Sequence, residues 1–246
     1  MVKIIVIILA AGYATRLHPL TKDKPKSLLP IAKKPIVEHI LEKLEPIGDI
    51  KKIYIVSNNK FFDVFQEWLS GINYVHPIEI VNNGTNSNEE RLGAVGDLAF
   101  CIQQKSIHDD IMVIAGDNLF EEPLLEHVNN FKKHKHNALV LYDVKDEVLC
   151  RHFGVVELQN NIITHFEEKP EHPRSTLVST GIYFFPQKTI ELLSKYIEQG
   201  NNPDKSGDFV AWLYKREPVY GIVSRRMWYD IGTFEQLEEA NRNYRQ

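Results

Sequence analysis

Residues 3–30 read Lys3-Ile-Ile-Val-Ile-Ile-Leu-Ala-Ala-Gly12-Tyr-Ala-Thr-Arg16-Leu-His-Pro-Leu-Thr-Lys-Asp-Lys-Pro-Lys26-Ser-Leu-Leu-Pro30, and the expected architecture of the chain starts from them. The segment 4–10 is an unbroken apolar run, mostly β-branched, with a period of neither two nor about 3.6 residues. A run of this kind is typical of a strand that is buried on both faces, as at the centre of a parallel sheet. We therefore expect the first strand to lie in the interior of a sheet.

The residues directly after this strand are suited to binding a polyphosphate. Ala10, Ala11 and Gly12 are small enough for a ligand to approach the backbone closely. Arg16 follows them, and a lysine-rich segment then leads to Lys26. A buried strand that runs into a small-residue turn and then into fixed cations favours phosphate oxygens as ligands.

The first half of the chain alternates short apolar runs with amphipathic segments. Strands are predicted over 52–57, 78–82 and 111–116, and helices over 36–44, 61–69, 93–104 and 122–133. Strands that alternate with helices of about ten residues imply βαβ units. The predicted fold class is therefore α/β, with a doubly wound, mainly parallel, Rossmann-like sheet.

The second half of the chain is richer in strands. We predict strands over 138–142, 154–158, 162–166, 178–185 and 219–223, and helices over 188–198 and 209–215. Asn160-Asn161 predicts a hairpin turn, and Thr233 with Gln236 predicts a capping box for a last, polar helix. This half is expected to form a smaller mixed region, and no linker divides the predicted single domain, 1–246.

The composition is that of an ordinary soluble globular protein. Of the 246 residues, 43% are hydrophobic and 25% are charged. The net charge of −4 argues against electrostatic binding to nucleic acid, and no basic stripe with interleaved aromatic residues is present. No apolar run approaches the ~20 residues of a membrane span. Cys101 and Cys150 have no metal-ligand spacing, so a reducing, cytoplasmic location is expected.

Several motifs together resemble a known family. The segment Leu9-Ala-Ala-Gly-Tyr-Ala-Thr-Arg-Leu-His-Pro-Leu-Thr21, followed by Lys24-Pro-Lys-Ser-Leu-Leu-Pro-Ile31, is similar to the signature of the sugar-1-phosphate nucleotidylyltransferases, which include glucose-1-phosphate thymidylyltransferases. The other motifs follow in the family order: Arg91-Leu-Gly, Gly116-Asp-Asn, Phe153-Gly-Val-Val-Glu, Glu168-Lys-Pro, Ser179-Thr-Gly and Tyr229-Asp-Ile-Gly-Thr. The chain resembles the short form, without the β-helical extension that some members carry.

The opening signature departs from the family pattern at two positions. The family often has glycine where this chain has Ala11 and Ala14. A positive φ at Ala14 would be unfavourable because alanine has a Cβ atom. The shape of this turn is therefore left to the structure.

The resemblance implies a magnesium site and two phosphate-binding cations. In the family, one aspartate from each of two segments binds a single Mg²⁺, and Asp117 and Asp230 match those positions. Asp117 also follows a predicted buried strand, at the carboxyl edge where open α/β sheets place ligands. Arg16 would hold the triphosphate and the departing pyrophosphate, and Lys26 would hold phosphate at the reacting centre. Catalytic roles are thus predicted for Arg16, Lys26 and Asp117.

The resemblance divides the remaining site residues between two substrates. Lys169 would hold the sugar phosphate and Glu168 the sugar hydroxyls. The sugar pocket would be lined by Gly154, Thr180 and Gly181. Nucleotide binding is predicted for Leu9, Ala10, Ala11, Gly12, Arg16, Arg91 and Gly93, with Gly93 allowing close approach. The segment 82–94 does not identify the nucleobase.

The reaction implied is transfer of a nucleoside monophosphate from a nucleoside triphosphate to a sugar-1-phosphate, with release of pyrophosphate. Glucose-1-phosphate with dTTP or UTP is the expected pair. Cytidylyl or guanylyl transfer to another sugar-1-phosphate or to phosphocholine stays open, and so does a homo-oligomer.

Two other classes of protein fit the sequence less well. A non-catalytic nucleotide-sensing relative would be expected to lose the arginine, lysine or aspartate positions, and all of them are present. A Rossmann oxidoreductase is disfavoured because Gly12-Tyr-Ala-Thr-Arg-Leu is not the Gly-x-Gly-x-x-Gly turn. It would also need an acid at the end of the second strand, where this chain has Ser57-Asn58.

Overall fold

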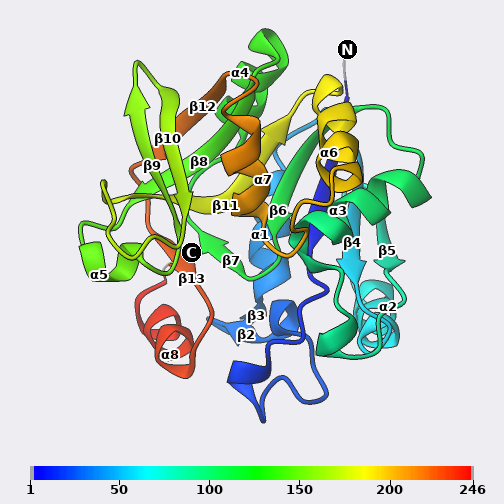
Figure 1. Cartoon of the computed structure of the whole chain (residues 1–246). Coiled ribbons are helices and arrows are strands. Elements are labelled where there is room, and N and C mark those ends of the chain that lie inside the picture. Colours follow the sequence, from blue (N-terminus) through cyan, green and yellow to red (C-terminus); the bar gives the residue numbers. More distant parts are fainter. Residues whose placement is uncertain (1–2, 245–246) are drawn as a thin grey trace.

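One sheet, with the first strand in its interior, runs through the computed structural model. The structure describes residues 3–244, so the first two and last two residues of the predicted domain 1–246 lie outside it. Within residues 3–244, nine strands form this sheet in the order β5-β4-β1-β6-β11-β8-β12-β10-β9 (Figure 1). The strands are β1 (Ile4–Leu9), β4 (Ile50–Ser57), β5 (Ile78–Asn82), β6 (Asp110–Ala115), β8 (Asn137–Asp143), β9 (Gly154–Gln159), β10 (Ile162–Glu168), β11 (Leu177–Phe185) and β12 (Val219–Ser224).

The strand directions agree with the predicted fold class. β1 is parallel to both of its neighbours, β4 and β6, and β4 is parallel to β5. β11 runs antiparallel to β6 and β8, and β10 runs antiparallel to β12 and β9. All strands of the sheet except β10 and β11 therefore point in one direction. The doubly wound α/β sheet is confirmed, and each of its antiparallel pairs includes β10 or β11 from the second half of the chain.

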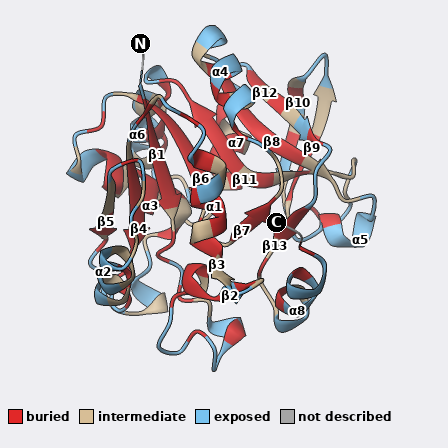
Figure 2. Cartoon of the chain, turned by 180° about the vertical axis from the view of Figure 1, so that it is seen from behind, coloured by how far each residue is buried: buried red, intermediate tan, exposed pale blue. Residues whose placement is uncertain are grey.

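Both faces of β1 are buried, because its side chains alternate between two apolar cores. Ile4, Val6 and Ile8 share a core with α1, α2 and α4, whereas Ile5 and Ile7 share a core with α3, α6 and α7. The helices are α1 (Ile36–Leu44), α2 (Phe62–Ser70), α3 (Gly93–Gln104), α4 (Leu125–His134), α5 (Glu147–Cys150), α6 (Lys188–Glu198), α7 (Ser206–Leu213) and α8 (Phe234–Asn243). Seen from behind, the strands carry most of the buried positions (Figure 2). The unbroken apolar run of β1 follows from this double burial.

Most predicted helices begin within one residue of their predicted start. α7 and α4 begin three residues away from it, because the first turn of α7 is polar and α4 follows a proline. α7 begins at Ser206 instead of 209, because its first turn, Ser-Gly-Asp, contains no apolar side chain. α4 begins at Leu125 instead of 122, after Pro123. Among residues 3–244, none of the helices combines the length and the apolarity that crossing a bilayer requires.

A small ribbon brings distant parts of the chain together beside the sheet. The ribbons outside the sheet are β7 (Asn118–Phe120) with β13 (Trp228–Asp230), and β2 (Pro30–Ile31) with β3 (Lys34–Pro35). In the first ribbon, Asn118 lies opposite Asp230. A third apolar cluster joins Leu17 of the opening stretch to Tyr229 of β13 and Leu237 of α8. The opening signature and the last motif therefore share one core.

Left-handed backbone conformations without glycine occur at several turns, and those at Ala14 and at Asn160-Asn161 test predictions from the sequence. Asn160 and Asn161 have φ angles of 53° and 63° between β9 and β10, which confirms the predicted hairpin turn. Ala14 has φ 48° and ψ 42°, the conformation that the sequence marks as unfavourable for alanine. A residue with a Cβ atom pays about 1–2 kcal/mol for it. The Thr21 hydroxyl donates to the Ala14 carbonyl at 2.7 Å and helps to hold the turn.

The capping box of α8 gives a direct test of the fold at its last helix. The Gln236 backbone N–H donates to Thr233 Oγ1 at 3.3 Å, and the Thr233 N–H donates to Gln236 Oε1 at 3.0 Å. Thr233→Ala should lower the free energy of unfolding by about 1 kcal/mol, measured by urea denaturation. Thr233→Ser keeps the hydroxyl and should unfold like the wild type. Equal midpoints for the alanine and serine variants would contradict this role.

Candidate active site

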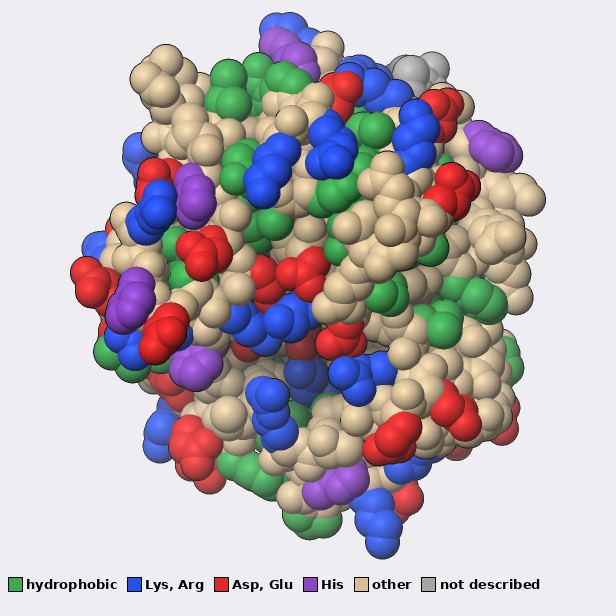
Figure 3. Space-filling model, in the orientation of Figure 1, with side chains coloured by type: hydrophobic (Ala, Val, Ile, Leu, Met, Phe, Trp, Pro, Cys, Tyr) green, Lys and Arg blue, Asp and Glu red, His purple; other side chains and the backbone are tan. Residues whose placement is uncertain are grey.

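A cavity of about 290 Å³ lies beside the β7–β13 ribbon, and side chains from distant parts of the sequence line it. It contains every residue predicted for catalysis, metal binding and sugar-phosphate binding: Arg16, Lys26, Asp117, Gly154, Glu168, Lys169, Thr180, Gly181 and Asp230. Figure 3 shows basic and acidic side chains gathered around a hollow near the middle of this face. The structure brings these residues together, and their individual roles stay predictions.

Two carboxylates and a lysine form the charged centre of this cavity. Asp117 lies two residues after the end of β6, and Asp230 ends β13 in the adjoining ribbon. The Lys26 ammonium donates to Asp117 Oδ2 at 2.5 Å. Burial and the neighbouring Asp117 carboxylate raise the pKa of Asp230 to about 6, although Lys26, Lys169 and Arg16 partly offset them. The charges therefore lie close enough to influence one another.

The donor set at this centre fits magnesium better than a softer metal. Among residues 3–244, no group of three or more His, Cys, Asp and Glu side chains is arranged to hold a metal by itself. Mg²⁺ usually binds through one or two carboxylates and takes its other oxygens from substrate phosphates and water. Asp117 and Asp230 supply that number of carboxylates, and a divalent cation would relieve their mutual repulsion. The magnesium site stays a prediction that this geometry favours.

Asn118 connects the segments that carry the two aspartates. Its side chain is fully buried, with 1% of its surface exposed. Asn118 Nδ2 donates to the Thr180 carbonyl at 2.6 Å, and Trp228 Nε1 donates to Asn118 Oδ1 at 2.9 Å. One amide group therefore joins β7, β11 and β13. In the sequence, Asn118 stood out only as the neighbour of Asp117 in the Gly116-Asp-Asn motif, and the available signal for its role was a polar side chain directly before the apolar pair Leu119-Phe120.

Glu168 and Lys169 lie at the end of β10 on the other side of the cavity. Burial raises the pKa of Glu168, and the nearby Lys169 and Lys205 partly counter this effect. A Cβ atom at Gly207, in the first turn of α7, would overlap the Glu168 carboxylate, so this glycine makes room for the acid. Lys169 has a φ of 53°, and its N–H donates to the Phe153 carbonyl at 2.9 Å. An unusual backbone conformation thus places this lysine at the cavity.

The structure adds lining residues that the sequence analysis did not single out. They are His152, Phe153, Tyr183, Ser206, Trp228 and Gly232. The Tyr183 hydroxyl and Ser206 Oγ share a hydrogen bond of 2.9 Å, which ties β11 to α7. Phe153 and Gly232 lie within the family motifs, so their sequence positions were a signal, whereas no motif includes Ser206.

Four of the residues predicted to bind nucleotide, Leu9 to Gly12, lie at the carboxyl end of β1. The Ala10 N–H donates to the Val56 carbonyl, and Asn58 Nδ2 donates to the Ala11 carbonyl, both at 2.9 Å. These bonds fix the backbone where it leaves the sheet, and Gly12, the next residue, is exposed. The backbone of Ala10 and Ala11 is therefore held in place just before the exposed turn that carries Arg16.

Arg91 and Gly93 contact a loop of this chain and do not line the cavity. Arg91 Nε donates to Asp204 Oδ1 at 2.9 Å. Gly93 has a φ of 80°, and a Cβ atom there would overlap the backbone at Asp204. The first amides of α3, Ala94 and Val95, donate to the Asp204 and Pro203 carbonyls at 2.9 Å. The close approach expected at Gly93 is thus made by the loop at 203–204, and nucleotide binding by both residues stays a prediction.

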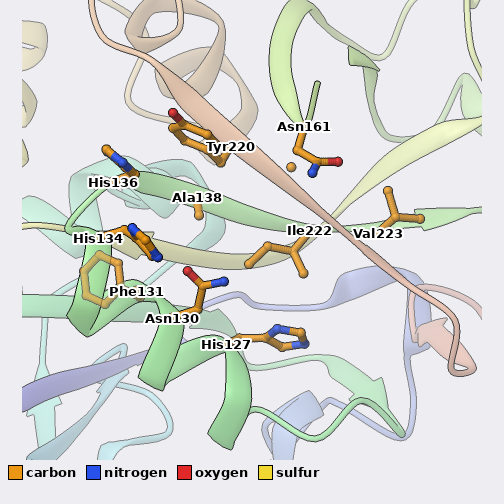
Figure 4. Close-up of a pocket in the computed structure, with 11 residues that line it drawn as sticks. His127, Asn130, Phe131, His134, His136, Ala138, Asn161, Tyr220, Ile222 and Val223 are labelled. Carbon is orange, nitrogen blue, oxygen red and sulfur yellow. The ribbon is translucent and has the colours of Figure 1, made fainter. Parts of the chain in front are cut away.

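A second hollow, of about 510 Å³, lies between α4 and β12, away from these residues. Figure 4 shows His134, His136 and Tyr220 along it, and the rings of His136 and Tyr220 stack with centroids 4.7 Å apart. Among the described residues that line it there is no Lys, Arg, Asp or Glu. Without such charges it is poorly suited to phosphate chemistry, so the charged cavity is the candidate active site.

Comparison with known proteins assigns the chain to a family. The family model described as nucleotidyl transferase matches residues 5–246. The chain belongs to the nucleotidyl transferase family. This nucleotidyl transferase is 36% identical over 242 residues to the bifunctional protein GlmU of Methanocaldococcus jannaschii, a match that covers 96% of this chain and 53% of that protein. It is 31% identical over 247 residues to the UTP–glucose-1-phosphate uridylyltransferase of Synechocystis sp., covering 96% and 62%.

A solved structure supports the same assignment. A Bacillus anthracis protein that carries the name of a glucose-1-phosphate thymidylyltransferase superposes with a TM-score of 0.83 and 29% identity. The match covers 100% of this chain and 97% of that chain. The resemblance inferred from the motifs is confirmed. The chain nevertheless spans only 53% and 62% of the lengths of the two curated relatives, so their full activities do not transfer by homology alone.

The raised pKa of Asp230 predicts that this carboxylate destabilises the fold. Since the folded state binds the proton more tightly than the unfolded chain, stability falls as pH rises from about 4 to about 6, and the full cost applies above that range. Asp230→Asn should therefore raise the free energy of unfolding by about 1–3 kcal/mol at pH 8, and by less at pH 5. Urea denaturation without divalent cations measures both. A variant less stable than the wild type at pH 8 would contradict the assignment.

Because the side-chain amide of Asn118 is buried and makes two hydrogen bonds, replacing Asn118 should lower the stability of the fold strongly. Asn118→Leu keeps a similar volume but leaves the Thr180 carbonyl and Trp228 Nε1 without partners. Each unpaired buried group costs about 1–3 kcal/mol, so the expected loss for the two groups is about 2–6 kcal/mol. The matched control is Asn129→Leu, at an exposed position of α4, which should change little. Equal unfolding midpoints for the two variants would refute the connecting role.

Proposed function

We propose that the chain transfers a nucleoside monophosphate from a nucleoside triphosphate to a sugar-1-phosphate in a magnesium-dependent reaction. The observation that carries the proposal is the convergence of Asp117 and Asp230 with Arg16, Lys26 and Lys169 on one cavity. Two anionic substrates repel each other, and such a set of cations and metal-binding carboxylates is suited to hold them together. Family membership supports the same reaction class.

The chemistry needs charge neutralisation and no general base. A phosphate oxygen of the sugar-1-phosphate is already anionic when it attacks the α-phosphorus, and pyrophosphate leaves in line. Asp117 and Asp230 would hold Mg²⁺, which neutralises negative charge on the phosphates. Lys26 would contact phosphate at the reacting centre, and Arg16 would hold the triphosphate and the departing pyrophosphate. This division fits the charged groups that line the cavity.

Lys169 and Glu168 would bind the acceptor. The ammonium of Lys169 would hold the sugar phosphate, and the Glu168 carboxylate would accept hydrogen bonds from sugar hydroxyls. Glucose-1-phosphate with dTTP or UTP is the proposed pair, since two related proteins carry glucose-1-phosphate in their names, one with UTP and one as a thymidylyltransferase. Another sugar-1-phosphate or phosphocholine with CTP or GTP is the alternative.

Pyrophosphate release tests the proposal. The chain should release pyrophosphate with Mg²⁺ and one pair drawn from dTTP, UTP, CTP and GTP and from a panel of sugar-1-phosphates plus phosphocholine. Asp117→Asn and Asp230→Asn should each reduce turnover by at least about a hundredfold, because each removes a carboxylate from the proposed metal site. Chelation of Mg²⁺ should have the same effect. Near-normal rates in both variants would reject the metal site, and silence across the panel with triphosphate binding intact would favour a nucleotide-sensing protein.

A further inference from the structure

The exposed turn after β1 is anchored by one buried aromatic side chain. Gly12, Thr15 and Arg16 are exposed, whereas Tyr13 keeps only 7% of its surface accessible. The Tyr13 ring lies against Phe61, with ring centroids 6.4 Å apart. The ring is held by this packing, and the Tyr13 hydroxyl in addition forms a hydrogen bond.

Three hydrogen bonds lead from this hydroxyl to a carboxylate on α3. The Tyr13 hydroxyl donates to Thr85 Oγ1 at 3.3 Å. Thr85 Oγ1 donates to Asn83 Oδ1 at 2.9 Å, and Asn83 Nδ2 donates to Asp97 Oδ1 at 2.6 Å. The Thr85 backbone N–H also donates to Asn83 Oδ1 at 2.9 Å, which fixes the orientation of the amide. We call these four residues the Tyr13–Asp97 relay.

Fold stability alone does not account for the acidic end of the relay. Asp97 is buried, and among residues 3–244 no cation forms an ion pair with it. Burial raises the pKa of Asp97 to about 6, and the bond from Asn83 offsets only part of this effect. A buried carboxylate without a cation destabilises a fold unless other interactions compensate. What Asp97 gives the relay is an oxygen acceptor for the Asn83 amide, which fixes the far end of the relay on α3.

The relay lies where open α/β sheets bind ligands. Tyr13 follows β1 and Asn83 follows β5, so both lie just beyond the carboxyl ends of parallel strands. The Asn83 N–H donates to the Ser57 carbonyl at 2.9 Å, and the Asn59 N–H donates to the Thr85 carbonyl at the same distance. The loop that receives the Tyr13 hydroxyl is thus tied to the end of β4.

We propose that the Tyr13–Asp97 relay positions the 12–16 turn, and with it Arg16, for the nucleoside triphosphate. The inference rests on the proposed function, because it assumes that the triphosphate binds at this turn. Tyr13 acts as a positioning residue: its hydroxyl fixes the turn against the loop after β5 and does not contact the reacting atoms. The turn needs such an anchor because Ala14 has a left-handed backbone conformation, which is unfavourable for alanine. Without restraint the backbone at Ala14 would change to a more favourable conformation.

The test removes one hydroxyl and keeps the packing. Tyr13→Phe should weaken binding of the preferred Mg²⁺–triphosphate by about threefold to tenfold, measured by calorimetry without acceptor. The KM for the acceptor should stay unchanged. The matched control is Tyr74→Phe, which removes a hydroxyl bonded to the Leu41 carbonyl away from the turn, and it should bind triphosphate like the wild type.

Asp97 provides the second arm of the test. Asp97→Asn keeps an oxygen acceptor for Asn83 and should bind triphosphate within about twofold of the wild type, whereas Asp97→Leu should match the loss in Tyr13→Phe. Triphosphate binding in Tyr13→Phe within twofold of the wild type would overturn the relay while leaving the proposed function standing. A folded wild-type chain that binds none of dTTP, UTP, CTP and GTP would overturn both.

Discussion

The double burial of β1 is the constraint on which the rest of the structure depends. Its residues alternate between two apolar cores, so the strand must lie inside the sheet with parallel neighbours on both sides. This position determines where the backbone leaves the sheet at Leu9, and therefore where the turn with Arg16 begins. The Gly116 N–H donates to the Leu9 carbonyl at 2.8 Å, which places Asp117 next to the same exit point.

Electrostatics then distinguishes the charged cavity at this edge from the uncharged hollow between α4 and β12. Asp117 and Asp230 lie in a partly buried site where like charges repel and water screens them poorly. Lys26, Lys169 and Arg16 offset part of the unfavourable burial and repulsion of these carboxylates. A site of this kind is unfavourable for the chain alone and favourable for a chain that binds a cation and phosphates together, which is the pattern expected of electrostatic catalysis.

Much of this arrangement could be predicted from the sequence, because local patterns carry it. The apolar run of β1, the asparagine turn at Asn160-Asn161 and the capping box at Thr233 depend on neighbouring residues, and all three are confirmed. The motifs identified the charged residues of the cavity. The partners of Arg91 and Asn118 could not be predicted, since they lie more than sixty residues away and depend on how loops pack. The bond from Tyr13 to Thr85, which begins the relay, spans 72 residues and could not be predicted for the same reason.

The pairing of β7 with β13 has a consequence for how the protein is made. A chain is synthesised from its N-terminus, and β13 follows every strand of the sheet in sequence. All strands of the sheet are therefore synthesised before Asp230. Until that last segment docks, Asp117 faces Lys26 without a second carboxylate, so a truncated chain that ends before Trp228 would keep the strands of the sheet and lack one of the two carboxylates proposed to hold the metal.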